Sequence, residues 1–350
     1  MDAFKYNVGM YGGCFDPLHV GHLSVIYKAA SDCKELYLVL SYSLARDATF
    51  YKTRCQWLYS AISHLSNVRI LLLEDASATK ADYDTDADWH DGSVKIKKLI
   101  GKKKDVVYCG SDYERPGCPY AKFYPESKLE FIDRNAIPVS SSAIRSDVFG
   151  YWDCLPAFVR PSFVKKVLVC GVESTGKSTL AATLAKMFCT EYVSETGRDV
   201  CQRCGSEEMM TTADFEEIIF KHKSAIIDAT RSANKILFVD TDAITTYFYA
   251  TFCRSLDNKT IVADHNVLKR IVDHYDLILF SDVDVPFVND GLRVEDRGVS
   301  RDKLGRWIKE LHAGEGSGDD LAGRKFVVLS GSYSDRFDAA RIEIERLLKQ

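Results

Sequence analysis

Two glycine-rich segments, each lying between an apolar run and a helix-forming stretch, constrain the fold of this chain more than any other feature. The first covers residues 12–22 and follows the apolar run 6–11. The second covers residues 171–178 and follows the apolar run 167–170. A strand that passes through a glycine-rich turn into a helix is typical of an open parallel sheet. The sequence therefore predicts two α/β domains, each with its own parallel sheet covered by helices.

Short apolar runs alternate with amphipathic stretches along the rest of the chain, which is the pattern of strand–helix–strand units. The predicted strands are residues 6–11, 36–42, 68–73, 106–109, 129–132, 167–170, 236–240, 277–280 and 326–329. The predicted helices are residues 21–31, 52–65, 93–100, 177–188, 213–232, 302–311 and 334–348.

The two series of elements meet at segment 149–164, which contains Pro156, Pro161 and several aromatic residues. Proline discourages helix, and the aromatic side chains favour a packed linker over a loose one. We therefore expect a first domain at residues 1–148, a linker at 149–164 and a second domain at 165–350. The 350 residues suffice for two domains of ordinary size.

Composition excludes several classes of protein. The net charge of −4 argues against a chain held on nucleic acid or on an anionic membrane by bulk charge. Eleven cysteines, an odd number without framework spacing, favour reduced thiols over a disulfide-stapled secreted domain. We see neither a signal peptide nor an apolar run of about 18 residues. We expect a cytoplasmic protein without a nucleic-acid or membrane partner.

His19 and His22 follow the turn that contains Gly13, Cys14 and Phe15. A spacing of three places both imidazoles on one side of the first helical turn, where the helix N-terminus attracts anions. The turn and the two imidazoles are therefore candidates to bind a triphosphate and to stabilise charge on its α-phosphoryl group during in-line attack. An ordinary helix cap is the alternative.

Residues 171–178 match the phosphate-loop pattern Gly-x4-Gly-Lys-Ser in full. The backbone N–H groups of such a loop surround the β-phosphate, Lys177 would bridge the β- and γ-phosphates, and the Ser178 hydroxyl would hold Mg²⁺. The candidate ATP-binding residues are Gly171, Glu173, Ser174, Thr175, Gly176, Lys177, Ser178 and Thr179.

Asp240 and Asp242 end the predicted strand 236–240. Carboxylates at the carboxyl end of a parallel strand lie beside the phosphate loop. One of them would organise Mg²⁺, with Asp240 as our candidate, and the other would orient or deprotonate a substrate hydroxyl. The sequence leaves the assignment open, and a turn or helix cap is the alternative.

Residues 12–22 resemble the ATP signature of nucleotidylyltransferases, which class I aminoacyl-tRNA synthetases share in part. A second segment favours the nucleotidylyltransferases, because residues 139–145 are similar to their Ser-x-Thr-x-Ile-Arg motif, with Ser142 where threonine is usual. Hydroxyls at a helix start together with Arg145 can bind the β- and γ-phosphates of the leaving pyrophosphate. This motif supplies Ser140, Ser141, Ser142 and Arg145 as candidates.

The chain as a whole resembles the NadR family, in which an adenylyltransferase precedes a ribosylnicotinamide kinase. The resemblance rests on both phosphate motifs in this order, on the linker residues from Trp152 to Lys165, and on segments 195–198 and 289–293. It implies a Rossmann-like first domain and a phosphate-loop kinase, with ATP and ribosylnicotinamide as substrates and Mg²⁺ as cofactor. The kinase would make nicotinamide mononucleotide, and the adenylyltransferase would join it to AMP to give NAD and pyrophosphate.

Further candidates come from their position or from the resemblance. Arg46, Gly110, Ser111 and Asp112 follow strands at the expected ligand edge, and Arg134 precedes the second signature. Trp89 is a candidate for stacking on nicotinamide, with core packing as the alternative. Candidates for the kinase substrate site and its lid are Glu195, Arg198, Asp290, Arg293 and Arg297. Either Arg297 or Arg301 would close over the γ-phosphate, with a solvated charged face as the alternative.

Three other functions stay open at this stage. One is a different nucleotidylyltransferase, for pantetheine phosphate or a cytidylyl group, fused to another small-molecule kinase. Another is an NAD or ATP sensor without catalysis, and the third is a nucleic-acid-linked ATPase. Some NadR members carry an N-terminal helix-turn-helix segment, which this sequence does not include, so we expect no DNA-binding role. The sequence leaves open whether the chain forms a homo-oligomer.

Overall fold

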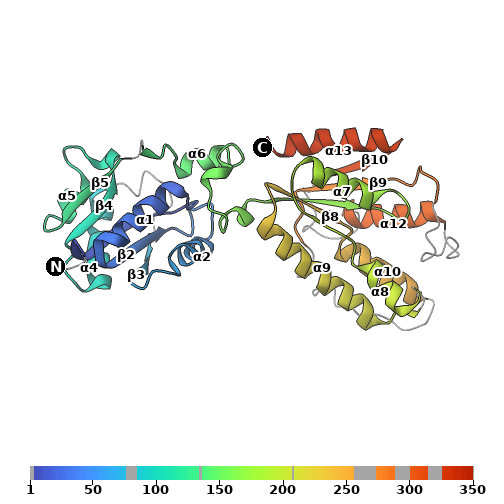
Figure 1. Ribbon diagram of the computed structural model, residues 1–350, viewed down its shortest axis with the longest axis horizontal. Coiled ribbons are helices and arrows are strands. Elements are labelled where there is room, and N and C mark those ends of the chain that lie inside the picture. The colour runs from blue at the N-terminus through green and yellow to red at the C-terminus, as the bar shows by residue number, and fades with distance from the viewer. Residues whose placement is uncertain are drawn as a thin grey trace. The chain divides into compact units, whose positions relative to one another are not determined.

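The computed structural model describes residues 4–75, 85–133, 136–206, 209–255, 273–287, 300–313 and 325–349. The chain forms two compact units, Met1–Arg160 and Pro161–Gln350. Each unit holds one five-stranded parallel sheet with helices packed on both faces (Figure 1). Two parallel-sheet α/β units confirm the fold class that the sequence predicts. The boundary between the units lies within the segment 149–164, where we expected a linker.

The N-terminal unit has the strand order β3-β2-β1-β4-β5. Its strands are β1 (Tyr6–Gly13), β2 (Cys33–Tyr42), β3 (Val68–Glu74), β4 (Val106–Gly110) and β5 (Lys128–Ile132). Its helices are α1 (Val20–Asp32), α2 (Tyr51–Ile62), α4 (Asp86–Ile100), α5 (Pro119–Phe123) and α6 (Ser141–Ser146). The strand order reverses between β1 and β4, and open α/β sheets bind ligands outside the carboxyl ends of strands at such a reversal.

The C-terminal unit has the strand order β10-β9-β6-β8-β7. Its strands are β6 (Lys165–Cys170), β7 (Tyr192–Val193), β8 (Ile236–Asp240), β9 (Leu277–Ser281) and β10 (Lys325–Leu329). Its helices are α7 (Lys177–Met187), α8 (Gly197–Cys204), α9 (Thr212–Ser232), α10 (Ala243–Ser255), α12 (Arg301–Ala313) and α13 (Tyr333–Leu347). Strand β6 lies in the centre of the sheet, so the turn that follows it is bordered by the ends of β8 and β9.

The two cores follow from strands that are apolar on both faces, as a sheet covered on both sides requires. In the N-terminal unit one face packs on α4 and α5 through Val8, Met10, Tyr37, Val39, Ile96, Ile100, Val107 and Tyr124. In the C-terminal unit one face packs on α7 and α13 through Val167, Val169, Phe238, Leu279, Leu184, Ile344 and their neighbours. These cores hold the strand ends, and hence both glycine-rich turns, in place.

Helix α10 was not predicted from the sequence. Its residues 244–249 are β-branched or aromatic, which favours a strand by local propensity. The Asp242 carboxylate accepts hydrogen bonds from the Thr245 N–H at 3.0 Å and from the Thr245 hydroxyl at 2.9 Å. This cap satisfies a backbone donor at the helix start, and it helps the helix to form against the local propensity.

Other differences from the predicted elements concern short segments and one helix start. Strand β7 and helices α5 and α8 were not predicted as elements, because each is too short to show a clear hydrophobic period. Helix α4 begins at Asp86, seven residues before the predicted start at 93. The Thr85 side chain accepts a hydrogen bond from the Asp88 N–H at 3.3 Å and so caps this earlier start.

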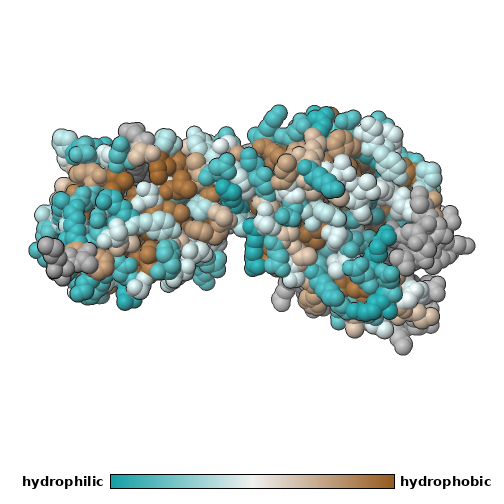
Figure 2. All heavy atoms as spheres, viewed as in Figure 1, coloured by the Kyte–Doolittle hydropathy of each residue, from teal (hydrophilic) through white to brown (hydrophobic). Residues whose placement is uncertain are grey.

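The surface mixes residue types. Figure 2 shows hydrophilic and hydrophobic residues interspersed over the visible face of both units, which is normal for a globular unit in water. Within the described parts of the chain, no helix is both long enough and apolar enough to cross a membrane.

We expect Leu184→Ala to destabilise the C-terminal unit by about 2–5 kcal/mol, because it removes a fully buried side chain from the cluster between α7 and the sheet. Met187→Ala on the same helix is the matched control, because Met187 is 46% exposed. Urea unfolding followed by circular dichroism and fitted with two transitions measures both. An equal loss of stability in both variants would contradict this account of the core.

Candidate functional sites in the two units

The turn after β1 carries the first candidate site. Phe15 adopts a positive φ of 50°, and the Asp16–Pro17 peptide bond is cis. The Phe15 and Leu18 side chains are buried, which fixes the turn on the sheet. Helix α1 then begins at Val20, with His19 as its N-cap. The turn therefore delivers both histidines to the carboxyl end of β1, at the reversal of strand order.

The two imidazoles lie against each other at the start of α1. Their ring centroids are 3.8 Å apart, and the rings are tilted by 27°. The edge of the His22 ring faces Phe15 with centroids 5.0 Å apart. The His19 backbone N–H donates to His22 Nδ1 at 3.4 Å, so the neutral His22 ring carries its proton on Nε2, which can donate to a phosphate. His19 is 5% exposed, whereas His22 is more open.

The second signature packs directly against this turn. The Ser140 side chain caps α6 by accepting from the Ala143 N–H at 3.1 Å. Ser141 Oγ donates to the Pro17 carbonyl at 3.1 Å, and Arg145 donates to the Asp16 carbonyl and, at 3.2 Å, to Ser142 Oγ. Two segments more than 120 residues apart in the chain thus share one corner of the unit, with hydroxyl, guanidinium and imidazole groups gathered there.

A buried arginine that the sequence analysis missed holds the same turn from behind. Arg54 of α2 is fully buried, and it donates to the Cys14 carbonyl at 2.7 Å and to Asp47 at 2.6 Å. Asp47 in turn accepts from the Ser43 N–H at 2.7 Å. Burial raises the pKa of the Cys14 thiol, so it stays protonated at neutral pH. The only available sign in the sequence was an arginine at a helix position whose neighbours are apolar.

The remaining candidates of the N-terminal unit fall into two groups. Gly110 ends β4, and Ser111 and Asp112 form the short 3₁₀ helix that follows, beside the turn after β1 in the sheet order. Arg46 pairs with Asp75 at 2.8 Å and with Asp47 at 3.5 Å.

Trp89 is half-buried near the start of α4. Its ring meets Tyr113 and Tyr120 edge to face, with centroids 6.3 and 5.0 Å apart. Tyr113 ends the 3₁₀ helix that begins at Ser111. Trp89 therefore belongs to an aromatic group beside the carboxyl end of β4.

The loop between β6 and α7 has the conformation that a phosphate nest requires. Gly171, Ser174 and Gly176 have φ values of 136°, 56° and 82°. A Cβ atom on Gly171 would lie 2.6 Å from the Ser281 carbonyl oxygen, so only glycine fits between β6 and β9 here. Lys177 begins α7, and its Nζ donates to the Val172 carbonyl at 2.6 Å. The lysine is thus held over the loop until a phosphate offers a stronger acceptor.

Asp240 stands next to this loop at the end of β8. It pairs in register with Val169 of β6 and is fully buried. Burial raises the pKa of its carboxyl group, against the opposing effects of Lys177 and a hydrogen bond with Ser178. One of its oxygens, Oδ2, is buried and has no hydrogen-bond partner among the described residues. This carboxylate is therefore available to a ligand or to the water shell of a metal ion.

Asp242 has a different environment. It is 1% exposed, and its Oδ1 accepts from Thr245 and lies 3.0 Å from His312 Nε2 of α12. His312 Nδ1 lies 2.8 Å from the Ile308 carbonyl, which can only accept. Burial would raise the pKa of Asp242, but the His312 charge and the Thr245 hydrogen bonds lower it overall. Asp242 Oδ1 therefore joins α10 and α12, while its Oδ2, like that of Asp240, is buried and has no hydrogen-bond partner among the described residues.

A pocket opens beside the phosphate loop, between α8, α9 and α10. Glu173, Lys177, Glu195, Arg198 and Thr241 contribute to its polar wall. Phe215, Ile218, Met210, Cys201 and Tyr249 contribute to its lining on the helix side. The Tyr249 hydroxyl donates to Glu173 Oε2 at 2.6 Å. The pocket therefore combines an apolar floor with two carboxylates near the end of the phosphate loop.

His222 of α9 also lines this pocket and was missed by the sequence analysis. It is 5% exposed, its Nε2 has no hydrogen-bond partner among the described residues, and burial lowers its pKa. Its position on the apolar face of α9, with Phe215, Ile218 and Ile226, was the available signal. A second pocket lies on the other side of the loop, between α7 and the start of α13, where Thr179, Leu180, Tyr333 and Phe337 meet.

Four candidates, Arg134, Asp290, Arg293 and Arg297, lie outside the described residues. Within the described parts of the chain, no group of three or more His, Cys, Asp or Glu side chains is arranged to hold a metal ion.

Two family models match this chain and divide it as the fold does. A cytidylyltransferase-like model matches residues 10–147, and an AAA domain model matches residues 166–336. The second model also covers the phosphate loop and Arg336. The matched ranges correspond to the two parallel-sheet units.

Curated relatives match across both units. The trifunctional NAD biosynthesis/regulator protein NadR of Escherichia coli (strain K12) is 29% identical over 323 residues, which cover 88% of this chain and 76% of the relative. The protein of the same name from Salmonella typhimurium is 30% identical over 321 residues, which cover 87% of this chain and 76% of the relative. A phosphopantetheine adenylyltransferase of Mycoplasma capricolum is 25% identical over 126 residues, which cover 31% of this chain and 87% of that protein.

Solved structures with the same fold span the whole chain. A NadR protein in complex with NR has a TM-score of 0.75 at 22% identity, and the match covers 100% of this chain and 98% of that one. A NadR protein in complex with NAD and AMP-PNP has a TM-score of 0.76 at 23% identity, with 98% and 96% covered. With its two units in this order and relatives aligned along nearly its full length, the chain belongs to the NadR family.

Proposed function

We propose that this chain is a bifunctional transferase of NAD biosynthesis. The C-terminal unit phosphorylates ribosylnicotinamide with ATP, and the N-terminal unit joins the resulting mononucleotide to AMP from a second ATP, which releases pyrophosphate. The observation that carries the proposal is a separate phosphate-binding turn at the carboxyl end of each sheet, in a chain of this family. We expect both reactions to take place in the cytoplasm, without nucleic acid as a partner.

In the N-terminal unit, catalysis depends on holding the two substrates in line and on stabilising the charge of the phosphates. The phosphate of the mononucleotide attacks the α-phosphorus of ATP, and negative charge grows on the α-phosphoryl oxygens. His22 Nε2 and His19, at the N-terminus of α1, donate to those oxygens. Arg145, Ser140, Ser141 and Ser142 hold the β- and γ-phosphates, which leave together as pyrophosphate. No covalent intermediate on the protein is needed.

The rest of this site would bind the nucleosides. Gly13, Cys14 and Phe15 let the turn approach the phosphates, and Gly110, Ser111 and Asp112 lie across the strand reversal for the adenosine. Trp89, within its aromatic group, is our candidate for the nicotinamide ring. Arg46 is the weaker phosphate candidate because its guanidinium already pairs with Asp75.

In the C-terminal unit, the loop N–H groups and Lys177 neutralise the β- and γ-phosphates. Asp240 lies beside Lys177 with one buried oxygen that lacks a partner, so it can accept the proton of the ribose 5′-hydroxyl as that oxygen attacks the γ-phosphorus. Asp242 is assigned a structural role because His312 and Thr245 occupy its Oδ1.

Ser178 and Asp240 fit a magnesium ion by their chemistry. Both offer oxygen ligands, they are hydrogen-bonded to each other, and Asp240 keeps an unsatisfied oxygen. Ser178 would hold the ion directly and Asp240 through water. When bound, the ion supplies charge neutralisation on the phosphate oxygens.

The acceptor pocket holds carboxylates and aromatic rings that can contact a cation, and Lys177 and Arg198 share its polar wall. Glu173 and Glu195 lie in its wall, and Phe215 and Tyr249 give it aromatic surface. The pyridinium ring of ribosylnicotinamide is flat and carries a fixed positive charge, which such a surface binds through ion pairing and cation–π contact. The second pocket, with Tyr333, Leu180 and Phe337, offers a flat apolar surface to the adenine of ATP.

A coupled assay tests the proposal. With ATP, Mg²⁺ and ribosylnicotinamide, the wild-type chain should form NAD, detected by mass spectrometry. His22→Ala should lower adenylyl transfer, measured with nicotinamide mononucleotide supplied, by about 10²–10³-fold and spare phosphorylation of ribosylnicotinamide. Lys177→Ala should do the reverse, because each change removes charge stabilisation from one site only. His64→Ala and Lys186→Ala, exposed residues of the same units, are the matched controls.

Three outcomes would count against it. No NAD from the wild type, with turnover of pantetheine phosphate in its place, would favour a different transferase. Tight nucleotide binding without turnover would favour a sensor. Loss of both reactions in either folded single variant would refute the assignment of separate sites.

We expect substitutions of Asp240 and Asp242 to have different effects. Asp240→Asn should lower kinase kcat by at least about 10³-fold, with little change in thermal stability, because it removes the base beside the phosphates. It should also raise the Mg²⁺ concentration needed for half-maximal rate. Asp242→Asn should mainly lower the melting temperature, because it leaves the buried His312 charge uncompensated. Kinase assays over a Mg²⁺ titration and differential scanning calorimetry measure these effects, and the opposite pattern would exchange the two roles.

A further inference from the structure

The carbonyl groups of residues 172–176 in the phosphate loop all accept hydrogen bonds. The Val172 carbonyl accepts from Thr175 Oγ1 at 2.8 Å and from Lys177 Nζ at 2.6 Å. The Gly176 carbonyl accepts from the Leu180 N–H within α7 at 3.0 Å. The three carbonyls between them, those of Glu173, Ser174 and Thr175, accept from two arginines that come from the last third of the chain.

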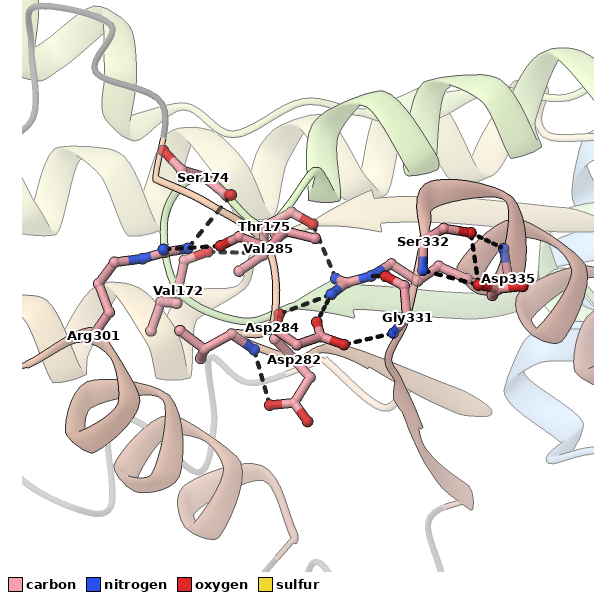
Figure 3. Close-up of polar contacts among 12 residues, drawn as sticks. Val172, Ser174, Thr175, Asp282, Asp284, Val285, Arg301, Gly331, Ser332 and Asp335 are labelled. Carbon is pink, nitrogen blue, oxygen red and sulfur yellow. Dashed lines mark hydrogen bonds and ion pairs between the residues drawn. The ribbon is translucent and has the colours of Figure 1, made fainter.

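Arg301, the first residue of α12, holds two of these carbonyls (Figure 3). Its Nη2 lies 3.1 Å from the Glu173 oxygen and 3.4 Å from the Ser174 oxygen, while its Nη1 donates to the Val285 carbonyl at 3.1 Å. The guanidinium also lies 5.5 Å from the centre of the Phe287 ring. The sequence left Arg301 either as a lid arginine over the γ-phosphate or as part of a solvated face, and in the structure its guanidinium bonds to the loop carbonyls.

Arg336 of α13 holds the third carbonyl from a buried position. It is 2% exposed and donates through Nη1 to the Thr175 oxygen at 3.2 Å. Its Nε donates to the Gly331 carbonyl at 3.0 Å, and its Nη2 donates to the Asp282 carbonyl at 3.2 Å and pairs with the Asp284 carboxylate. One planar group thus joins the phosphate loop to the ends of β9 and β10.

We propose that Arg301 and Arg336 are positioning residues, which hold the phosphate loop in its nucleotide-binding conformation before nucleotide arrives. In a trans peptide the carbonyl of one residue and the N–H of the next point in opposite directions. Fixing the carbonyls of residues 173–175 outward therefore fixes the N–H groups of residues 174–176 inward, toward the β-phosphate. Two guanidinium groups behind the loop also add positive potential at the phosphates.

The geometry explains why both residues are arginine. Arg336 serves four acceptors in three directions, and a lysine ammonium on a flexible stem cannot reproduce that planar arrangement. Arg301 likewise donates through Nη1 to the Val285 carbonyl and through Nη2 to the loop. A positioning role predicts equal effects on every ligand that carries a β-phosphate, whereas a γ-phosphate contact predicts an effect on ATP alone.

The test measures the KM for ATP and the inhibition constant of ADP in the kinase reaction. All proteins carry His22→Ala, so that the mononucleotide accumulates and the N-terminal site does not consume it. Arg301→Ala and Arg336→Lys should each weaken the binding of ATP and of ADP by the same factor, about tenfold or more. Each change removes charged hydrogen bonds to the loop. Arg341→Ala is the matched control, since Arg341 lies on α13 but pairs with Asp338 and Glu345.

A second measurement needs no catalysis. Hydrogen exchange of the residue 174–176 amides in the nucleotide-free protein should be faster in Arg301→Ala and Arg336→Lys, with the exchange of β6 unchanged. This inference rests on the nucleotide site proposed above and not on the acceptor. A wild type without kinase activity would refute the proposed function, while hydrogen exchange would still test the arginines. Loss of ATP affinity with ADP unaffected, or unchanged exchange and affinity, would overturn the positioning role.

Discussion

The structure depends on one constraint, that backbone N–H groups at the carboxyl end of a central strand must converge on one point. Both units meet it with a tight turn that leaves the strand and enters a helix, so the N–H groups and the helix N-terminus act together on an anion. Positive φ values at Phe15 in one unit and at Gly171, Ser174 and Gly176 in the other make these turns. The parallel sheets, with cores on both faces, keep the turns rigid.

The two turns stabilise the negative charge of the phosphates with different groups. The N-terminal turn is short and adds two stacked imidazoles with donors from a distant helix, since Ser141 and Arg145 bond to the carbonyls of Pro17 and Asp16. The C-terminal turn is longer, surrounds the phosphate with its own amides and adds Lys177. This difference matches the chemistry proposed for each unit, because adenylyl transfer develops charge at the α-phosphorus and kinase transfer develops it at the γ-phosphorus.

Buried or half-buried arginines support both turns from behind. Arg54 binds the Cys14 carbonyl in the N-terminal unit, and Arg301 and Arg336 bind the loop carbonyls in the C-terminal unit. A guanidinium suits this task because it stays charged and donates in several fixed directions. The same unit gives its two aspartates different neighbours: Asp242 Oδ1 lies against His312 and Thr245, while Asp240 lies beside Lys177. Pre-organisation of this kind lets bound nucleotide meet charges that are already in place.

The sequence by itself determined the two parallel-sheet units, their order, nearly all strands and both phosphate-binding turns, because apolar periodicity and glycine spacing act over a few residues. It did not predict helix α10, whose β-branched and aromatic residues favour a strand until Asp242 caps them. It also could not separate Asp240 from Asp242, place Arg301 behind the loop, or find Arg54, His222 and Arg336. Their roles depend on neighbours that lie far away in the chain, such as His312 for Asp242, and burial and pairing between distant segments arise only when the sheet brings those segments together.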